Sequence, residues 1–356
     1  RQMCIRDRYS GGVDSSLIFS YARDINKEIC AITADFGDYD DASERSLPLI
    51  HSYNHKNHIL KEVSRQDEDK SFSYLTDICE SPFDDDSVIP SNTVFHTVKS
   101  HGYRVALTGD GADELFCGYE TFSKLNKMSK MLNPKYDTLR AGFNSIFGNV
   151  PDKFKDTNFQ RLFMDESSLL VDLSCNGFKK RAWGNGIISD YDPFHHVEKL
   201  LKNYDGLDVI SKFRMLQLSF RLPNQMLYKV DRASMFNSVE ARPVFLNNRI
   251  VELALKISSR VMMQDGTKGL LKQMCSKKLP TKEWQMPKTG FGWKTGSYSH
   301  IYNSVDDQYL YQATKIKGST LLRNKRSANK RRAYYALRSL VMWQKNLSNT
   351  TKDGLF

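Results

Sequence analysis

The sequence predicts an α/β protein in which helices cover both faces of a parallel sheet and a mainly helical second half follows. As far as about Glu120, short apolar runs alternate with segments of helical periodicity. This alternation is typical of parallel sheets. Beyond that point the strand signals fade and helical spacing dominates. With 356 residues, of which 40% are hydrophobic and 26% charged, the chain can bury a large core.

Three strands are predicted in the first part of the chain, over residues 29–34, 58–63 and 105–107. The first leads into Asp35, and the last leads into Thr108 and Gly109. A strand before Ser10 is poorly supported, since Arg6, Asp7 and Arg8 interrupt the apolar sequence that a central parallel strand needs.

Helical patterns separate these strands, and turns divide the second half. The predicted helices span residues 15–23, 41–53, 67–79 and 91–101, and a closing helix spans 333–343. Turns are predicted at 203–206 and 264–266. Because ligands of open parallel sheets bind at the carboxyl ends of the strands, the segments after residues 34 and 107 are the first places to search for a site.

Charge and cysteine usage narrow the class of protein. The chain carries 52 Lys and Arg against 41 Asp and Glu, a net charge of +11, which favours an anionic partner such as a phosphate-bearing ligand or a nucleic acid. Six widely spaced cysteines without a CxxC pair argue against a disulfide framework or a zinc site, and they fit a reduced, cytoplasmic protein. We find no signal peptide and no apolar run of about 18 residues.

The segment Ser10–Ser16, which reads SGGVDSS, is the first chemical signal. Its two glycines allow close approach of the backbone to an anion, and the helix that follows offers free N–H groups. Serine hydroxyls add donors, and Asp14 could hold Mg²⁺ on a phosphate group. No GxxxxGK[ST] loop is present. A plain helix cap is the alternative interpretation.

The second signal, LTGDGADELFCGY at residues 107–119, follows a predicted strand. Asp110, Asp113 and Glu114 are close together, and such a cluster is costly unless a cation or hydrogen bonds compensate. Mg²⁺–ATP would supply the cation. An acid-rich helix N-terminus is the alternative, but it leaves the flanking glycines unexplained.

Together these motifs resemble a known family. SGGVDSS is similar to the pyrophosphate (PP) loop of ATP-pyrophosphatases of the adenine nucleotide alpha hydrolase-like type, which split ATP into AMP and pyrophosphate. Residues 107–119 resemble the SG[ED]GxDELFGGY motif of glutamine-dependent asparagine synthetases. Further similar segments are LPNQMLYKVDRASM at 222–235, SVEAR at 238–242, KGLLK at 268–272 and PKTGFG at 287–292. The resemblance extends from about Ser10 to Trp343 and implies one synthetase-type domain, with an α/β core at about 1–122 and a helical part at about 123–356.

The resemblance implies an ATP-dependent ligase that makes asparagine from aspartate through β-aspartyl-AMP. Asp14 and Asp113 would hold Mg²⁺ and pyrophosphate, Lys268 and Lys288 would neutralise charge that develops on the phosphates, and Asp110 would position or deprotonate ammonia. The implied nucleotide-binding residues are Ser10, Gly11, Gly12, Asp14, Ser15, Ser16, Thr108, Gly109 and Asp113. Considered alone, Lys268 is better interpreted as one more exposed helix lysine.

Departures from the family pattern leave alternatives open. Only nine residues precede Ser10, so we expect the family's glutaminase domain to be absent from this chain and ammonia to be its nitrogen source, directly or from a separate glutaminase partner. Cys117 replaces a glycine, and residues 242–247 read RPVFLN where the family usually reads RxPFLD. A relative that amidates another carboxylate, such as a sugar acid, therefore stays open. So do a tRNA-modifying enzyme and a nucleotide-binding remnant without catalysis.

Overall fold

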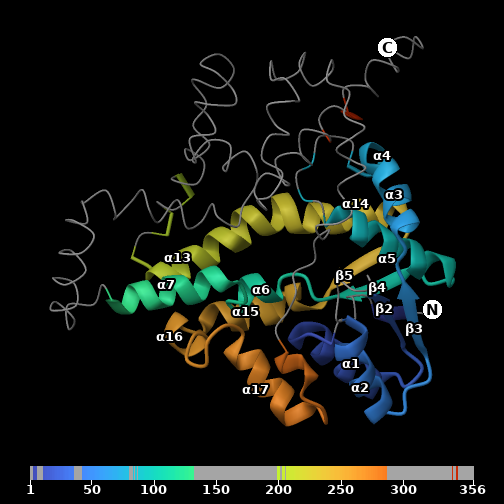
Figure 1. The fold of residues 1–356 in the computed structure, drawn as a ribbon. Helices are drawn as coiled ribbons and strands as arrows, with labels where there is room; N and C mark the ends of the chain where they lie inside the picture. Colours follow the sequence, from blue (N-terminus) through green and yellow to red (C-terminus); the bar gives the residue numbers. More distant parts are fainter. Residues whose placement is uncertain are drawn as a thin grey trace, which may run out of the picture.

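The computed structural model in Figure 1 describes residues 3–5, 11–35, 42–79, 83, 85, 87–131, 199–200, 203–204, 206–286, 339 and 342–343. Within these residues the chain forms a five-stranded sheet in the order β3-β2-β1-β4-β5. The strands are β1 (Met3–Ile5), β2 (Cys30–Asp35), β3 (His58–Glu62), β4 (Val105–Thr108) and β5 (Glu240–Pro243). Every neighbouring pair is parallel. The predicted parallel sheet is therefore confirmed.

Helices pack on both faces of this sheet. In the first part they are α1 (Val13–Ile25), α2 (Ala42–Ser52), α3 (Arg65–Ser73), α4 (Leu75–Cys79), α5 (Val88–Ser100), α6 (Ala112–Leu115) and α7 (Glu120–Met131). One core joins Ala31 of β2 to Phe19 of α1 and lies on one face. The other core joins Cys30 and Ile32 to Phe95 of α5 and lies on the opposite face. Adjacent β2 residues enter different cores because side chains alternate along a strand.

Three sequence predictions need correction. The central strand is β1, which ends at Ile5, before the charged residues that made a strand there look poor. The single helix predicted over 67–79 is two helices, α3 and α4, that part at Tyr74. Near this break the Ser73 hydroxyl donates to the Lys70 carbonyl at 2.7 Å, and such a local bond competes with the regular helical pattern.

The third correction is β5, which lies in the half predicted to be mainly helical. Its residues Glu240–Pro243 are exposed or half-buried, so the sequence has no apolar pattern there that would predict a strand. Proline at its end is typical of an edge strand. Glu240 and Arg242 form an ion pair, with Arg242 Nε 2.7 Å from Glu240 Oε1. Both side chains are exposed, so the pair contributes little to stability.

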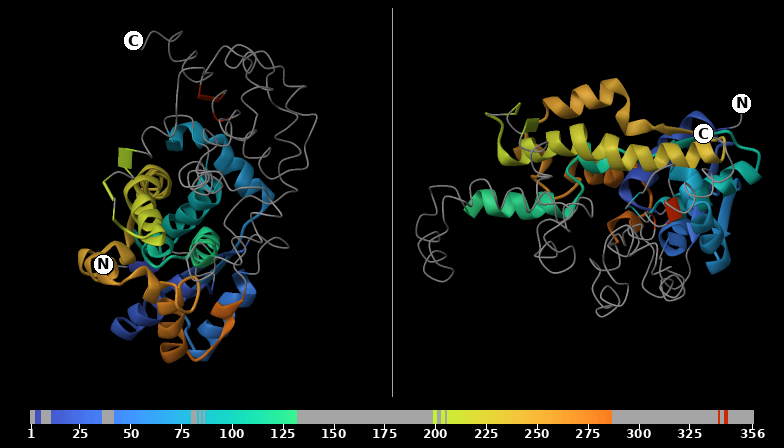
Figure 2. Two further views of the ribbon diagram at one scale, coloured as in Figure 1. Left: turned by 90° about the vertical axis from the view of Figure 1, so that its left-hand side faces the viewer. Right: turned by 90° about the horizontal axis from the view of Figure 1, so that it is seen from above.

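The remaining described elements of the second half are helical, as predicted. They are α13 (Val209–Leu216), the π-helix η5 (Gln217–Leu227), α14 (Tyr228–Phe236), η6 (Val244–Leu246), α15 (Asn248–Lys256), α16 (Ser259–Met262), α17 (Gly269–Lys278) and η7 (Glu283–Gln285). Figure 2 shows that α13, η5 and α14 follow one another as a long helical run. Lys229 of α14 donates to Ser87 Oγ at 2.8 Å and pairs with Asp85 at 3.3 Å, which ties this run to the start of α5.

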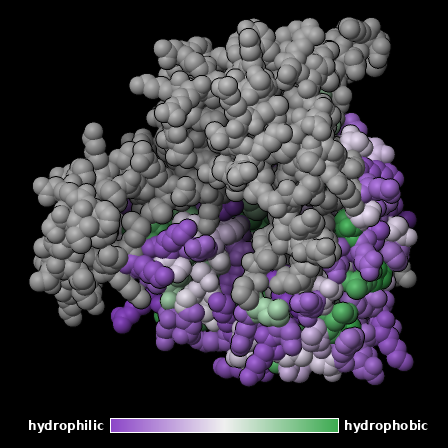
Figure 3. Space-filling model, viewed as in Figure 1, coloured by the Kyte–Doolittle hydropathy of each residue, from purple (hydrophilic) through white to green (hydrophobic). Residues whose placement is uncertain are grey.

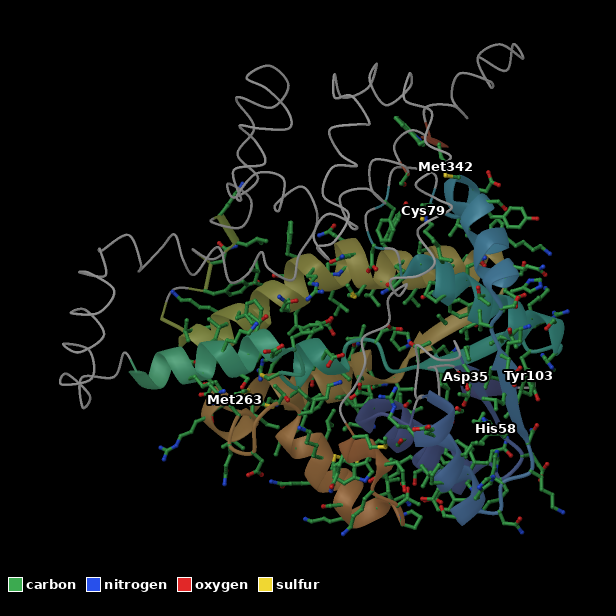
Figure 4. The ribbon with its side chains drawn as sticks, in the orientation of Figure 1. Asp35, His58, Cys79, Tyr103, Met263 and Met342 are labelled. Carbon is green, nitrogen blue, oxygen red and sulfur yellow. The ribbon has the colours of Figure 1, made fainter. Side chains whose placement is uncertain are left out.

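Both predicted turns are present, with left-handed glycines at Gly206 and Gly266. Of the predicted closing helix, Ser339, Met342 and Trp343 are described, and all three are helical. Met342 packs against the core that contains Cys79 (Figure 4).

The part of the described surface that is visible in Figure 3 is mainly polar. On the face drawn in Figure 3, hydrophobic residues are scattered among hydrophilic ones. Among the described residues, no helix has the length and apolar character needed to cross a bilayer. The four cysteines described with their side chains, Cys30, Cys79, Cys117 and Cys275, are buried thiols.

We expect the free energy of unfolding to fall as the pH is lowered, because His58 stays neutral in the fold. Its Nε2 lies 3.0 Å from Thr33 Oγ1 on the β3 side of the sheet (Figure 4). Burial, with smaller contributions from His55 and His51, lowers the pKa of His58 from 6.5 to about 4. The unfolded chain therefore takes up a proton that the folded protein excludes, and stability is lost as the pH falls through this window.

Since the ring is half-buried, we expect His58 to account for about 1–2 kcal/mol of the loss between pH 7 and pH 4.5. Urea unfolding at both pH values measures it, and His58→Gln should remove that part of the loss. His96→Gln, on an exposed position of α5, is the control and should behave as wild type. Equal acid sensitivity of His58→Gln and wild type would contradict the prediction.

Candidate functional site

The two sequence motifs meet because the strands that precede them are neighbours. β1 pairs in parallel with β4, with Cys4 opposite Ala106 and Ile5 opposite Leu107. The segment with Gly11, Gly12 and α1 follows β1, and the turn of residues 109–111 with α6 follows β4. Both therefore lie at the carboxyl edge of the sheet, where ligands of open parallel sheets bind.

The start of α1 leaves backbone donors available. Gly12, the N-cap, is extended and provides no side-chain cap. Ser15 and Ser16 are buried; the Ser15 hydroxyl donates to the Gly12 carbonyl at 3.2 Å, and the Ser16 amide donates to it at 3.0 Å. The first N–H groups of a helix without such a cap can bind an anion.

Gly11 has a conformation and a position that other residues cannot share. Its φ is +64°, in the left-handed region, and a Cβ added there would lie 2.2 Å from the Arg45 carbonyl oxygen. We expect Gly11→Ala to lower the free energy of unfolding by about 2 kcal/mol or more, because it adds a backbone clash to the cost of the left-handed conformation.

Gly102→Ala is the matched control for Gly11→Ala. Gly102 has a φ of +80°, and an added Cβ would meet nothing within 4 Å. This variant should show only the conformational cost of about 1 kcal/mol in urea unfolding. Equal losses in the two variants would mean that the α2 backbone moves away from Gly11 without difficulty.

Lys268 lies at the centre of the site. Its Nζ is 2.5 Å from Asp14 Oδ2 and 2.5 Å from Asp113 Oδ1. It is 7% exposed and has a left-handed φ of 55° directly before α17. The carboxylates of Asp14 and Asp113 thus converge on one ammonium from the ends of two neighbouring strands. Lys268 is therefore a buried lysine and not one more exposed helix lysine.

Electrostatics favour the charged form of Lys268. Burial alone would lower its pKa, but the carboxylates of Asp113 and Asp14 more than offset this, so its pKa lies above the ordinary value. One ammonium then lies between two carboxylates. A buried pair of this kind contributes little net stability, but the loss of one partner is costly.

Two buried oxygen atoms of the site have no hydrogen-bond partner in the part of the chain that the structure describes. Among the described residues, Asp14 Oδ1 and Thr108 Oγ1 are buried without a hydrogen bond. A buried oxygen atom without a hydrogen bond costs free energy of folding, and a bound ligand can supply the missing hydrogen-bond donor or cation. Carboxylate and hydroxyl oxygens are also suitable ligands for Mg²⁺.

Gly118 closes the site beside Lys268. A Cβ at Gly118 would lie 1.9 Å from Asp113 Oδ1 and 2.3 Å from Lys268 Cε. Its amide donates to the Asp113 carbonyl at 2.8 Å, and Cys117 before it has a left-handed φ of 55°. This is the usual backbone ending of a helix, where glycine is the common residue at the position of Cys117.

Glu114 is a buried acid next to the site. It is 2% exposed, and the Tyr119 hydroxyl donates to its Oε1 at 2.5 Å. Burial, followed by the charge of Asp113, raises the pKa of Glu114 to about 7. Burial also raises the pKa of Tyr119. The Arg221 guanidinium of η5 lies over the Tyr119 ring, 4.5 Å from its centroid.

The structure unites most, but not all, of the residues that the sequence singled out. Gly11, Gly12, Asp14, Ser15 and Ser16 form one side of the site, and Thr108, Gly109, Asp110 and Asp113 form the other. Asp110 is half-buried in the turn after β4. Ser10 and Lys288 lie outside the described residues. Sequence reasoning quoted Glu114, Gly118 and Tyr119 within a motif but gave none of them a role in the site.

An open parallel sheet whose polar residues gather where its strands end defines the chain as an α/β protein of the open-sheet class. The particular family follows from comparison with known proteins. A family model described as asparagine synthase matches residues 9–345, and the chain belongs to this family.

Similar proteins carry related names. Asparagine synthetase [glutamine-hydrolyzing] 1 of Bacillus subtilis is 25% identical over 302 residues, which cover 79% of this chain and 45% of that protein. Putative asparagine synthetases [glutamine-hydrolyzing] of Mycobacterium bovis and Mycobacterium tuberculosis are 24% identical over 291 residues, which cover 79% of this chain and 44% of theirs. The chain thus spans less than half the length of these relatives.

Proposed function

We propose that this chain is an ATP-dependent amide-forming ligase that makes asparagine from aspartate. The observation that carries the proposal is the meeting of Asp14 and Asp113 at Lys268, at the strand edge where ligands bind, in a member of the asparagine synthase family. In the proposed reaction an oxygen of the aspartate β-carboxylate attacks the α-phosphorus of ATP and pyrophosphate leaves. Ammonia then attacks the β-aspartyl carbon of β-aspartyl-AMP, loses a proton and displaces AMP.

The residues of the site suit these steps. The uncapped N-terminus of α1 and residues 10–16 bind the phosphates, and Thr108 and Gly109 contact the nucleotide. Lys268 and Lys288 stabilise negative charge that develops on the phosphate oxygens. Asp110 positions the attacking ammonia or accepts its proton. Residues up to about 122, together with β5, form the α/β core of the synthetase domain, and the other residues from about 123 form its helical part.

The donor set also fits a divalent cation. Asp14 and Asp113 would hold Mg²⁺, and Asp14 Oδ1, which has no hydrogen-bond partner among the described residues, is available for it. When bound, Mg²⁺ would neutralise the charge of ATP and of the leaving pyrophosphate. Lys268, which holds both carboxylates in this structure, would then turn toward the phosphates.

ATP–pyrophosphate exchange tests the proposal. We expect the purified chain to exchange labelled pyrophosphate into ATP only when aspartate and Mg²⁺ are present. It should form asparagine and AMP with ammonium chloride but not with glutamine alone. Asp14→Asn should abolish exchange, whereas Asp231→Asn, at an exposed position of α14, should not.

Other outcomes identify the alternatives. Exchange that depends on a sugar acid and not on aspartate would assign the chain to the amidation of another carboxylate. If a folded protein that binds ATP shows no exchange with aspartate and none with a sugar acid, the ligase proposal is overturned. Consumption of ATP that depends on tRNA would favour a tRNA-modifying enzyme.

A further inference from the structure

Glu114 and Tyr119 form a hydrogen-bonded pair that the proposed reaction does not use. The Tyr119 hydroxyl reaches across the end of the short helix α6 to Glu114 Oε1, 2.5 Å away. Glu114 is 2% exposed, and burial of a carboxylate costs free energy unless hydrogen bonds or charges compensate. The pair encloses residues 115–118, the turn that closes the site.

This turn has a fixed backbone. Gly118 donates to the Asp113 carbonyl at 2.8 Å, Phe116 donates to the Ala112 carbonyl at 2.9 Å, and the left-handed Cys117 lies between them. The Lys268 amide donates to the Phe116 carbonyl at 3.2 Å. The turn therefore contacts Lys268 through its backbone and Asp113 through Gly118, which has no space for a Cβ.

The other side of Tyr119 is held by the π-helix η5. The guanidinium of Arg221 lies over the Tyr119 ring and is held in turn by Gln217 Oε1 at 3.4 Å and Gln225 Oε1 at 3.3 Å. π-helical turns often occur at functional sites. A continuous series of contacts thus connects η5, through Tyr119 and Glu114, to the residues that bind each other at the centre of the site.

We propose that Glu114 and Tyr119 are a positioning pair, which holds the turn of residues 116–118 against Asp113 and Lys268 and so sets the geometry of the proposed ligase site. The proposal rests on the proposed function for its catalytic consequence. The contact between Asp113 and Lys268 can, however, be measured without any reaction.

The reactivity of Lys268 toward acetic anhydride, followed by mass spectrometry, provides that measurement. In the wild type, Lys268 is buried and paired, so we expect it to be acetylated slowly. Tyr119→Phe removes one hydroxyl and keeps the ring, and we expect about fivefold faster acetylation of Lys268. Glu114→Ala should have a similar effect, and the double variant should exceed neither single variant, because residues of one network act together.

Tyr53→Phe is a closely matched control. The Tyr53 hydroxyl is 2.9 Å from Ser20 Oγ, and the Arg23 guanidinium lies 4.4 Å from the centroid of the Tyr53 ring. Tyr53 thus has a hydroxyl contact and a cation–π contact, as Tyr119 does, but both partners belong to α1. Removal of the Tyr53 hydroxyl should leave the acetylation of Lys268 unchanged. Wild-type acetylation of Lys268 in a folded Tyr119→Phe protein, or equal acceleration in Tyr53→Phe, would overturn the proposal.

Exchange kinetics add the catalytic consequence. Tyr119→Phe should lower kcat of ATP–pyrophosphate exchange about tenfold and change KM for ATP less than twofold, as expected for misplaced groups. If the wild type shows no exchange, the proposed function fails while the acetylation result stands. If exchange is present and kcat of Tyr119→Phe equals that of the wild type, the positioning role fails.

Discussion

Lys268→Met is expected to destabilise the protein and to abolish most of its proposed activity. The substitution leaves Asp14 and Asp113 facing each other without the ammonium that lies 2.5 Å from each. Loss of one partner from a buried ion pair costs about 3–5 kcal/mol, and we expect about 3 kcal/mol here, because the Asp113 side chain is 25% exposed. Adenylation turnover should fall about a hundredfold or more, since the cation proposed to stabilise phosphate charge is lost.

The metal gives this prediction a second, independent measurement. In the wild type the Lys268 ammonium competes with Mg²⁺ for the two carboxylates, and Lys268→Met removes this competitor. Calorimetry without nucleotide should therefore show tighter Mg²⁺ binding to Lys268→Met than to wild type, and millimolar Mg²⁺ should restore part of the lost stability. Lys277→Met, exposed on the same helix, should change neither quantity. Weaker Mg²⁺ binding in Lys268→Met would contradict a shared site.

Periodicity and strand-end motifs predicted the parts of the fold that depend on local sequence. β2, β3 and β4 are runs bounded by polar residues, and they appear within one or two residues of the predicted positions. The family resemblance implied that Asp14 and Asp113 share one site, although the sequence supported the strand before Ser10 poorly. Because β1 and β4 are parallel neighbours that end at the same edge, the fold brings the two residues together. Their two motifs lie about a hundred residues apart in the sequence, and the topology brings them together.

Other features depend on tertiary contacts that no local pattern records. β5 has no apolar alternation, and it forms because the edge of β4 offers backbone partners at residues 105–108. Lys268 resembles a surface lysine in the sequence, and its burial becomes visible only when α17 is placed against α1. Tyr119 resembles a core aromatic residue, and its bond to Glu114 depends on the left-handed turn at Cys117. Because position 117 is a cysteine and not the glycine that usually adopts a left-handed conformation, the sequence did not predict this turn.

Lys288 differs from Lys268 in what its removal should show. It lies outside the described residues, so the argument rests on its motif, PKTGFG at 287–292, which is too glycine-rich for a helix interior and suits a loop that folds over a ligand. Lysine is a compact point charge suited to a phosphate. In adenylation, negative charge grows on the bridging and non-bridging phosphate oxygens. A cation placed there stabilises the transition state more than it stabilises bound ATP.

Lys288→Ala should therefore lower adenylation turnover about a hundredfold or more, while ATP binding weakens much less. Stability should barely change, in contrast to Lys268→Met, if Lys288 contacts only the ligand. Lys288→Arg should recover little activity, because a planar guanidinium does not replace a point charge in a closed site. Pyrophosphate exchange and ATP titration measure the two effects separately. Equal losses of affinity and turnover would make Lys288 a residue that binds ATP without favouring the transition state, and unchanged turnover would remove it from the site.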